Sequence, residues 1–150
     1  MSEDAALTLP PALPAGPSLS PGGRGVRFAG YAAVFGQVDR GGDVIRAGAF
    51  AASLKRGGVP LLWQHEPGRP IGRIEYLQED RRGLRVIGRV VDGRAAALVK
   101  AGAVTGLSFG YRVRDAGGAA PRELKALDLV EVSLVTFPMQ PAARVHAVEG

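Results

Sequence analysis

A serine between two glycines is the residue of this sequence best suited to nucleophilic chemistry. Ser108 is the centre of Gly106-Leu107-Ser108-Phe109-Gly110, which matches the Gly-x-Ser-x-Gly pattern of many serine hydrolases. The pattern is weak alone, because a chain with 22 glycines can meet it by chance. Its context also differs from that of an α/β-hydrolase, where a strand leads into the serine and a helix follows. Here a helical segment comes first and an alternating strand follows.

A nucleophilic serine needs a base to take its proton, and only two histidines are available. His65 ends the apolar run 60–64 and precedes a proline- and glycine-containing segment, so we expect it at the rim of a sheet with an open tip. His146 lies among the last residues of the sequence, where precise placement is harder. His65 is therefore the preferred base.

A histidine base needs an acceptor on its second ring nitrogen, and two carboxylates in the apolar run 127–135 are candidates. Glu131 interrupts the run most plainly, and strict alternation places it on one face with Leu127, Leu129, Ser133 and Val135. A simple hairpin turning at residues 117–118 would put Ser108 opposite Leu127, which brings Asp128 nearer than Glu131.

The order of candidates along the chain keeps a second triad open. Ser108, Asp128 and His146 follow one another as they do in α/β-hydrolases, which would fit an unrelated esterase or amidase. A third interpretation is a catalytically idle scaffold protein, in which these residues have only structural roles.

Several classes of function are disfavoured by what the sequence lacks. There is no cysteine, no phosphate-binding loop, no dinucleotide fingerprint and no His-Glu-x-x-His motif, so we expect neither a cofactor nor a metal. The net charge of +5 comes from scattered arginines, which disfavours a nucleic-acid partner. No apolar run reaches the roughly 18 residues of a transmembrane helix, so we expect a cytoplasmic protein without a membrane partner.

The elements that must position these residues are mostly strands. Alternation predicts strands over 26–35, 71–77, 84–91, 104–114 and 124–137, with the second and third forming a hairpin. Short helices are predicted over 48–56 and 94–101, and residues 66–70 are predicted to form a loop. The sum favours a mainly β fold, an antiparallel β-barrel ringed by short helices.

The domain organisation is simple. Residues 1–24 contain five prolines together with glycine and serine, which predicts a disordered arm. Residues 25–145 are expected to form one catalytic domain, and residues 146–150 a tail.

Five segments in fixed order resemble the caudovirus prohead (capsid maturation) serine proteases. The segments that carry the likeness are Gly30-Tyr31-Ala32-Ala33-Val34-Phe35, Gly48-Ala49-Phe50, Leu61-Leu62-Trp63-Gln64-His65, Gly106-Leu107-Ser108-Phe109-Gly110-Tyr111 and Leu129-Val130-Glu131-Val132-Ser133-Leu134-Val135-Thr136. The resemblance implies the fold of the herpesvirus maturation proteases. It also implies Ser108 as nucleophile, His65 as general base and Glu131 as third member. Because the herpesvirus enzymes use a second histidine there, His146 remains the alternative.

The same resemblance implies a role in virion assembly. The expected activity is serine endopeptidase action on the major capsid protein and its scaffolding segment, inside assembling capsids in a bacterial host. Self-cleavage, for which the arm 1–24 offers an accessible place, and self-association are compatible with this role.

Overall fold

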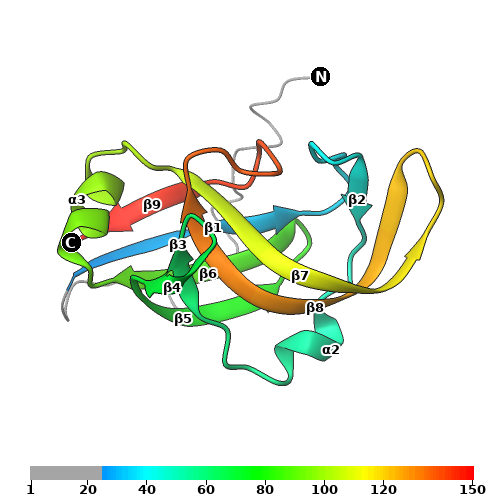
Figure 1. Cartoon of the computed structure of the whole chain (residues 1–150), viewed down its shortest axis with the longest axis horizontal. Helices are drawn as coiled ribbons and strands as arrows, with labels where there is room; N and C mark the ends of the chain where they lie inside the picture. The colour runs from blue at the N-terminus through cyan, green and yellow to red at the C-terminus, as the bar shows by residue number, and fades with distance from the viewer. Residues whose placement is uncertain (1–24) are drawn as a thin grey trace.

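Residues 25–150, the part of the chain that the computed structural model describes, form mainly β-strands (Figure 1). The predicted arm 1–24 lies outside the described residues. The first sheet has the order β5 (Gly72–Glu79), β6 (Gly83–Val90), β1 (Val26–Val34), β9 (Val145–Glu149), and each strand is antiparallel to its neighbours. It contains the predicted hairpin. The predicted tail from His146 onward instead forms most of the edge strand β9.

The second sheet is built around the long strand β8 (Arg122–Val135). Strand β7 (Gly106–Gly117) pairs with β8 along its whole length in antiparallel fashion. On the other side, β2 (Asp43–Ile45) and β3 (Leu61–Trp63) pair with opposite ends of β8, both in parallel. The sheet is therefore not purely antiparallel as predicted, because two short strands arrive by crossover connections.

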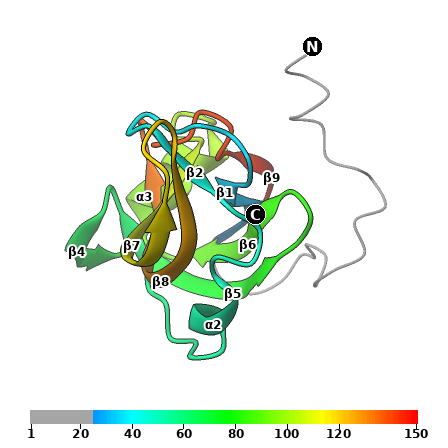
Figure 2. The same ribbon diagram turned by 90° about the vertical axis from the view of Figure 1, so that its right-hand side faces the viewer.

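Strand β4 (Glu66–Pro70) completes the second sheet and corrects the predicted loop at these residues. It pairs with β3 in a tight hairpin, which Figure 2 shows projecting from one side of the molecule. All five residues of β4 are exposed. The sequence predicts a loop here because four of them are poor strand formers: Glu66, Pro67, Gly68 and Pro70. The pairing with β3 is what holds them extended.

Two short segments join the edges of the sheets. Residues 143–145 lie between β1 and β7, with Tyr31 N–H donating to Arg144 O at 3.2 Å and Leu107 N–H donating to Ala143 O at 2.9 Å. On the opposite side, Ile71 N–H donates to Leu61 O at 3.1 Å, while its own carbonyl accepts from Val91 N–H at 2.8 Å. The sheets thus wrap around one core and meet at two hydrogen-bonded seams.

The core between the sheets is mainly aliphatic, with three buried phenylalanines, Phe28, Phe50 and Phe109. Its fully buried side chains include Phe28, Phe50, Leu61, Ile71, Leu84, Leu107, Leu124 and Leu134. Gly88 is required by this packing, because a Cβ there would lie 2.7 Å from the ring of Phe28. Burying each such side chain stabilises the fold by roughly 1.5–3 kcal/mol.

Two helices, α2 (Ala51–Leu54) and α3 (Gly93–Lys100), lie on the outside of the described sheets. Asp92 is the N-cap of α3, and its side chain accepts a hydrogen bond from Ala95 N–H at 2.9 Å. Helix α2 is shorter than the predicted segment 48–56. No helix of residues 25–150 has the length and apolar character needed to cross a bilayer.

Candidate active site

The register between β7 and β8 places Ser108 directly opposite Ser133. The neighbours of Ser108, Leu107 and Phe109, point into the core, so Ser108 lies on the outer face of the second sheet. Directly opposed residues share a face, and Ser133 therefore lies beside Ser108 on that outer face. Ser133 is fully buried and Ser108 is 5% exposed.

Glu131 reaches the same face because β8 carries an irregularity at Val130. The pairing passes from Tyr111–Leu129 to Gly110–Glu131 and leaves Val130 unpaired. Leu127 and Leu129 consequently point into the core, while Glu131 points outward beside Ser133. Strict alternation, which put Glu131 on one face with these leucines, is wrong here because it did not include the extra residue.

The hairpin turn also lies further along the chain than residues 117–118. Gly117 pairs with Glu123, so the turn spans 118–122, and Ser108 faces Ser133 instead of Leu127. This shift of six residues removes the objection that Glu131 is too far along the strand. Glu131 is two residues from the partner of Ser108, whereas Asp128 lies opposite Arg112.

His65 reaches the outer face through the β3–β4 turn. Parallel pairing sets Leu62 opposite Ser133, and Gln64 and His65 form the two-residue turn that follows. Both turn residues have positive φ, 52° and 61°, a conformation that hairpins of this kind require but that side chains other than glycine seldom adopt. Non-glycine residues held in this region are found disproportionately at functional sites.

Hydrogen bonds from β8 and its continuation hold this turn in place. His65 N–H donates to Ser133 Oγ at 3.1 Å, and Gln64 N–H donates to Leu134 O at 2.9 Å. The amide of Gln64 donates to Thr136 Oγ1 at 2.8 Å and accepts from Thr136 N–H at 3.1 Å. The unusual conformation of His65 is thus fixed by the strand that carries Glu131.

A short chain of hydrogen bonds joins the side chains of His65, Glu131 and Ser133. His65 Nδ1 lies 2.5 Å from Glu131 Oε2, and Ser133 Oγ donates to Glu131 Oε1 at 2.7 Å. The hydrogen bond with Glu131 raises the pKa of His65 above its usual 6.5, outweighing partial burial, which acts in the opposite direction. With Nδ1–H donating to the carboxylate, Nε2 is the nitrogen left to accept a proton.

Gly110 provides the space for the carboxylate. It lies opposite Glu131, and a Cβ at Gly110 would be only 2.5 Å from Glu131 Oε2, the atom that contacts His65. The second glycine of the Gly-x-Ser-x-Gly pattern therefore has a role different from that in an α/β-hydrolase. It makes room for the acid that holds the histidine.

Ser108 stands on the other side of Ser133 from His65. With adjacent strands about 4.8 Å apart, the backbones of β7 and β3 are roughly 10 Å apart across β8. Within residues 25–150, no hydrogen bond joins the Ser108 hydroxyl to His65; catalytic hydrogen bonds commonly reach their full geometry only in the complex with substrate. Ser108, His65 and Glu131 are thus gathered on one face of three adjacent strands.

The alternative third members lie elsewhere. Asp128 forms ion pairs with Arg56 and Arg114. Desolvation acts to raise the pKa of Asp128, but the hydrogen bonds and charges of the two arginines together outweigh it and lower the pKa. His146 belongs to the first sheet, where its ring lies 6.1 Å from that of Tyr31. Desolvation, together with the charges of Arg85 and Arg82, lowers the pKa of His146 to about 4. The Ser108–Asp128–His146 set is therefore not assembled in this fold.

Two members of this cluster were missed by the interpretation of the sequence. For Ser133, which contacts both His65 and Glu131, alternation predicts no more than a shared face with Glu131. The spacing Glu131-x-Ser133 is the available signal, since residues two apart on a strand share a face. The role of Gly110 depends on cross-strand register, which no local pattern contains.

Comparison with known proteins gives sequence and structural relatives. The family model described as caudovirus prohead serine protease matches residues 18–150. The prohead protease of Enterobacteria phage HK97 is 36% identical over 135 residues, which cover 82% of this chain and 60% of that protein. A capsid polyprotein of Pseudomonas phage PAJU2 is 26% identical over 106 residues, covering 61% of this chain and 16% of the polyprotein. The chain thus spans less than two thirds of the prohead protease and about a sixth of the polyprotein.

Solved structures give the same fold. The KSHV protease in complex with a hexapeptide phosphonate inhibitor superposes with a TM-score of 0.61 at 12% identity, covering 85% of this chain and 66% of that one. The bacteriophage T4 capsid assembly protease gives 0.60 at 15% identity, with coverage of 76% and 84%. The predicted mainly β, herpesvirus-protease-like fold is confirmed.

Proposed function

This chain belongs to the caudovirus prohead serine protease family, and from that membership we propose that it is a serine endopeptidase of capsid maturation. Its proposed substrates are the major capsid protein and the scaffolding segment of that protein, cut within assembling capsids. The proposal extends to self-cleavage. The family supports the reaction class, and the arrangement of side chains on the outer face of β3, β8 and β7 supports the roles proposed for them.

The proposed mechanism is acyl transfer through Ser108. His65 Nε2 accepts the proton of the Ser108 hydroxyl as Oγ bonds to the scissile carbonyl carbon. The protonated His65 then gives this proton to the leaving amine, and water, deprotonated by the same nitrogen, releases the acyl group. Glu131 receives Nδ1–H throughout, so it fixes the tautomer and stabilises the imidazolium that forms. Ser133 orients Glu131 and the backbone of His65.

The observation that carries this proposal is the 2.5 Å contact between His65 Nδ1 and Glu131 Oε2 on the face that bears Ser108. A carboxylate that is only 8% exposed is costly unless hydrogen bonds compensate it, and here two side chains do so. The positive φ of His65 adds a further conformational cost. An idle scaffold would need neither feature, which is why the enzymatic interpretation is favoured.

The test is coexpression with the cognate major capsid protein. The wild-type chain is expected to shorten the capsid protein, and Ser108→Ala is expected to leave it intact. Labelling with a serine-directed phosphonate is expected to modify Ser108 alone. An intact capsid protein in the presence of wild-type chain, together with no labelling of Ser108, would overturn the proposal in favour of a scaffold.

A further inference from the structure

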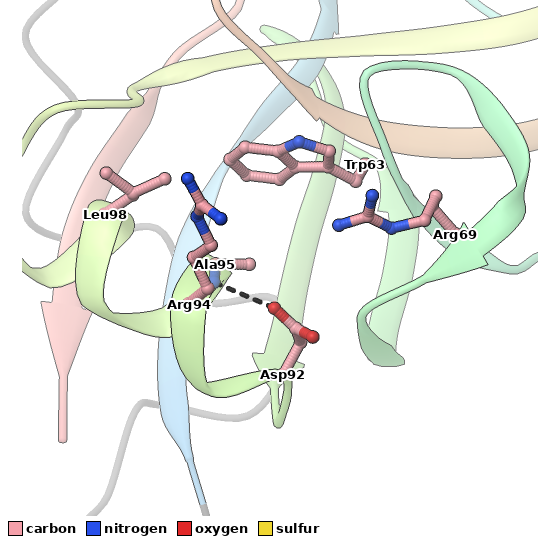
Figure 3. A pocket seen from close by; sticks show the side chains of 6 residues that line it. All are labelled: Trp63, Arg69, Asp92, Arg94, Ala95 and Leu98. Carbon is pink, nitrogen blue, oxygen red and sulfur yellow. Dashed lines mark hydrogen bonds between the residues drawn. The ribbon is translucent and has the colours of Figure 1, made fainter.

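A pocket of about 340 Å³ lies apart from Ser108, His65 and Glu131, between the β3–β4 hairpin and helix α3 (Figure 3). The residues that line it are Trp63, Arg69, Asp92, Arg94, Ala95 and Leu98. The indole of Trp63 forms one wall. Figure 3 shows the guanidinium groups of Arg94 and Arg69 on two sides of the space below that indole.

The charges of this pocket are unbalanced in favour of cations. Two arginines face one carboxylate, and that carboxylate is already engaged as the N-cap of α3, accepting from Ala95 N–H. Arg69 has only a 4.0 Å contact with Glu66, with both side chains 54% exposed. Within residues 25–150, the guanidinium of Arg94 has no ion pair or hydrogen bond. Two cationic groups are thus available to an anionic ligand.

The remaining surface of the pocket is apolar. Trp63, Ala95 and Leu98 offer an indole face and aliphatic groups, which suit a side chain or a short backbone segment more than a free inorganic ion. A ligand that combines carboxylates with aliphatic carbon matches both features. Glutamate or aspartate within a polypeptide is the simplest such ligand.

The position of the pocket connects it to the proposed active site. Trp63 and Arg69 belong to the same hairpin as His65 and lie two and four residues from it. Trp63 pairs with Leu134 and packs against the core, so its indole points away from the face that carries Ser133. A polypeptide held at Ser108 could reach the pocket by passing around the exposed edge strand β4.

From these features we propose that the pocket binds an acidic stretch of the polypeptide substrate, with Arg69 and Arg94 contacting its carboxylates and Trp63 packing on its aliphatic part. This proposal rests on the proposed protease function, because it assigns a recognition site for the same substrate. It adds a contact outside the reacting residues. Substrates would thereby be selected by acidic residues beyond the scissile bond.

Trp63 makes the test direct, because it is the only tryptophan of the chain and its emission reports on this pocket. The experiment uses the full chain with Ser108→Ala, so that a bound peptide is not cut. The probe is the blocked hexapeptide acetyl-Ala-Glu-Leu-Glu-Ala-Ala-amide, and its glutamine counterpart is the uncharged control. The expected result is a saturable change in Trp63 emission with the glutamate peptide, weaker at high salt, and at least about tenfold weaker binding of the glutamine peptide.

Matched variants assign the effect to the two arginines. Arg69→Gln and Arg94→Gln are each expected to raise the Kd of the glutamate peptide about threefold to tenfold. Arg46→Gln removes an arginine of equal side-chain exposure, 54%, that lies by β2 and does not line the pocket. It is expected to leave the Kd unchanged. Equal effects of all three variants, or equal binding of both peptides, would reduce the interaction to net charge and overturn the proposal.

Other occupants would give different results. A Trp63 emission that changes with protein concentration in the absence of peptide would assign the pocket to a second copy of the chain. Tighter binding of a thymidine oligonucleotide than of the glutamate peptide would assign it to nucleic acid. Either result contradicts the proposal. Because binding is measured without cleavage, the two proposals fail separately. Arginine-dependent peptide binding by a chain that neither cuts capsid protein nor is labelled at Ser108 would refute the protease function and leave only a site for acidic peptides.

Discussion

Ser108 and Ser133 lie directly opposite each other on β7 and β8, yet their hydroxyl groups are in different situations. Ser133 is fully buried, donates to Glu131 and accepts from the backbone of His65. Ser108 is slightly exposed and its hydroxyl is not committed to either group. Of two serines side by side, one is therefore suited to attack a substrate and the other to hold the base and the acid.

Removing the Ser133 hydroxyl tests this division. Ser133→Ala deprives Glu131 Oε1 and His65 N–H of their partner, so we expect kcat/KM to fall about 10- to 100-fold and stability to fall by about 1–3 kcal/mol. Phosphonate labelling of Ser108 is expected to persist at a lower rate. The measurements are peptide hydrolysis, thermal unfolding and mass spectrometry. Loss of all labelling in well-folded Ser133→Ala would instead identify Ser133 as the nucleophile.

The hydrogen bond between His65 and Glu131 predicts a pH dependence. Only neutral His65 can take the Ser108 proton, so kcat/KM should rise with pH through the pKa of His65, which its hydrogen bond to Glu131 raises above 6.5. Glu131→Gln removes the acceptor charge and should move the midpoint to lower pH while reducing the plateau. An unchanged midpoint would mean that Glu131 does not contact the titrating base.

The same interaction has a signature in stability. The pKa of His65 is higher in the folded chain than in the unfolded chain, so the pair with Glu131 contributes stability that is fully present below pH 6.5. This contribution is lost as pH rises through the raised value. We expect the difference in Tm between wild type and Glu131→Gln to shrink across that interval, measured by thermal denaturation at a series of pH values.

Gly110 offers a test of the space around the acid. In Gly110→Ala the new methyl group would lie 2.5 Å from Glu131 Oε2, so the carboxylate must leave the position in which it contacts His65. We expect kcat/KM to fall about 100-fold, since a displacement near 1 Å can cost this much. Gly93→Ala is the control, because nothing lies within 4 Å of a Cβ at that position and activity should remain.

Much of this site could be predicted from the sequence, and the remainder depends on register. His65 and Ser108 can be singled out as candidates because a histidine after an apolar run and a serine between glycines are local patterns. No local pattern decides between Glu131 and Asp128 as the carboxylate near Ser108. The choice depends on the unpaired Val130 and on a turn at 118–122, and each changes which residues face each other. The same holds for β4, whose residues have little strand propensity and are extended only because β3 pairs with them.

The competing triads can be separated by single substitutions. His65→Ala is expected to lower kcat/KM by about 10⁴-fold, the usual effect of removing a catalytic base. His146→Ala and Asp128→Asn should change it less than about threefold, because His146 packs on Tyr31 in the other sheet and Asp128 is held by Arg56 and Arg114. Loss of peptide hydrolysis confined to His146→Ala would replace the proposed triad with its rival.

Gln64 lies in the β3–β4 turn at positive φ, and its side chain forms two hydrogen bonds with Thr136. Gln64→Ala keeps a side chain at φ 52° but removes the two hydrogen bonds with Thr136, so we expect a loss of about 1 kcal/mol in stability. Gln64→Gly loses the same bonds but adopts positive φ without the cost of a Cβ, about 1–2 kcal/mol. Tm should therefore be higher for Gln64→Gly than for Gln64→Ala, while kcat/KM falls in both because His65 is held less firmly. The reverse order of Tm would show that this turn is not left-handed in solution, and the geometry assigned to His65 would then be wrong.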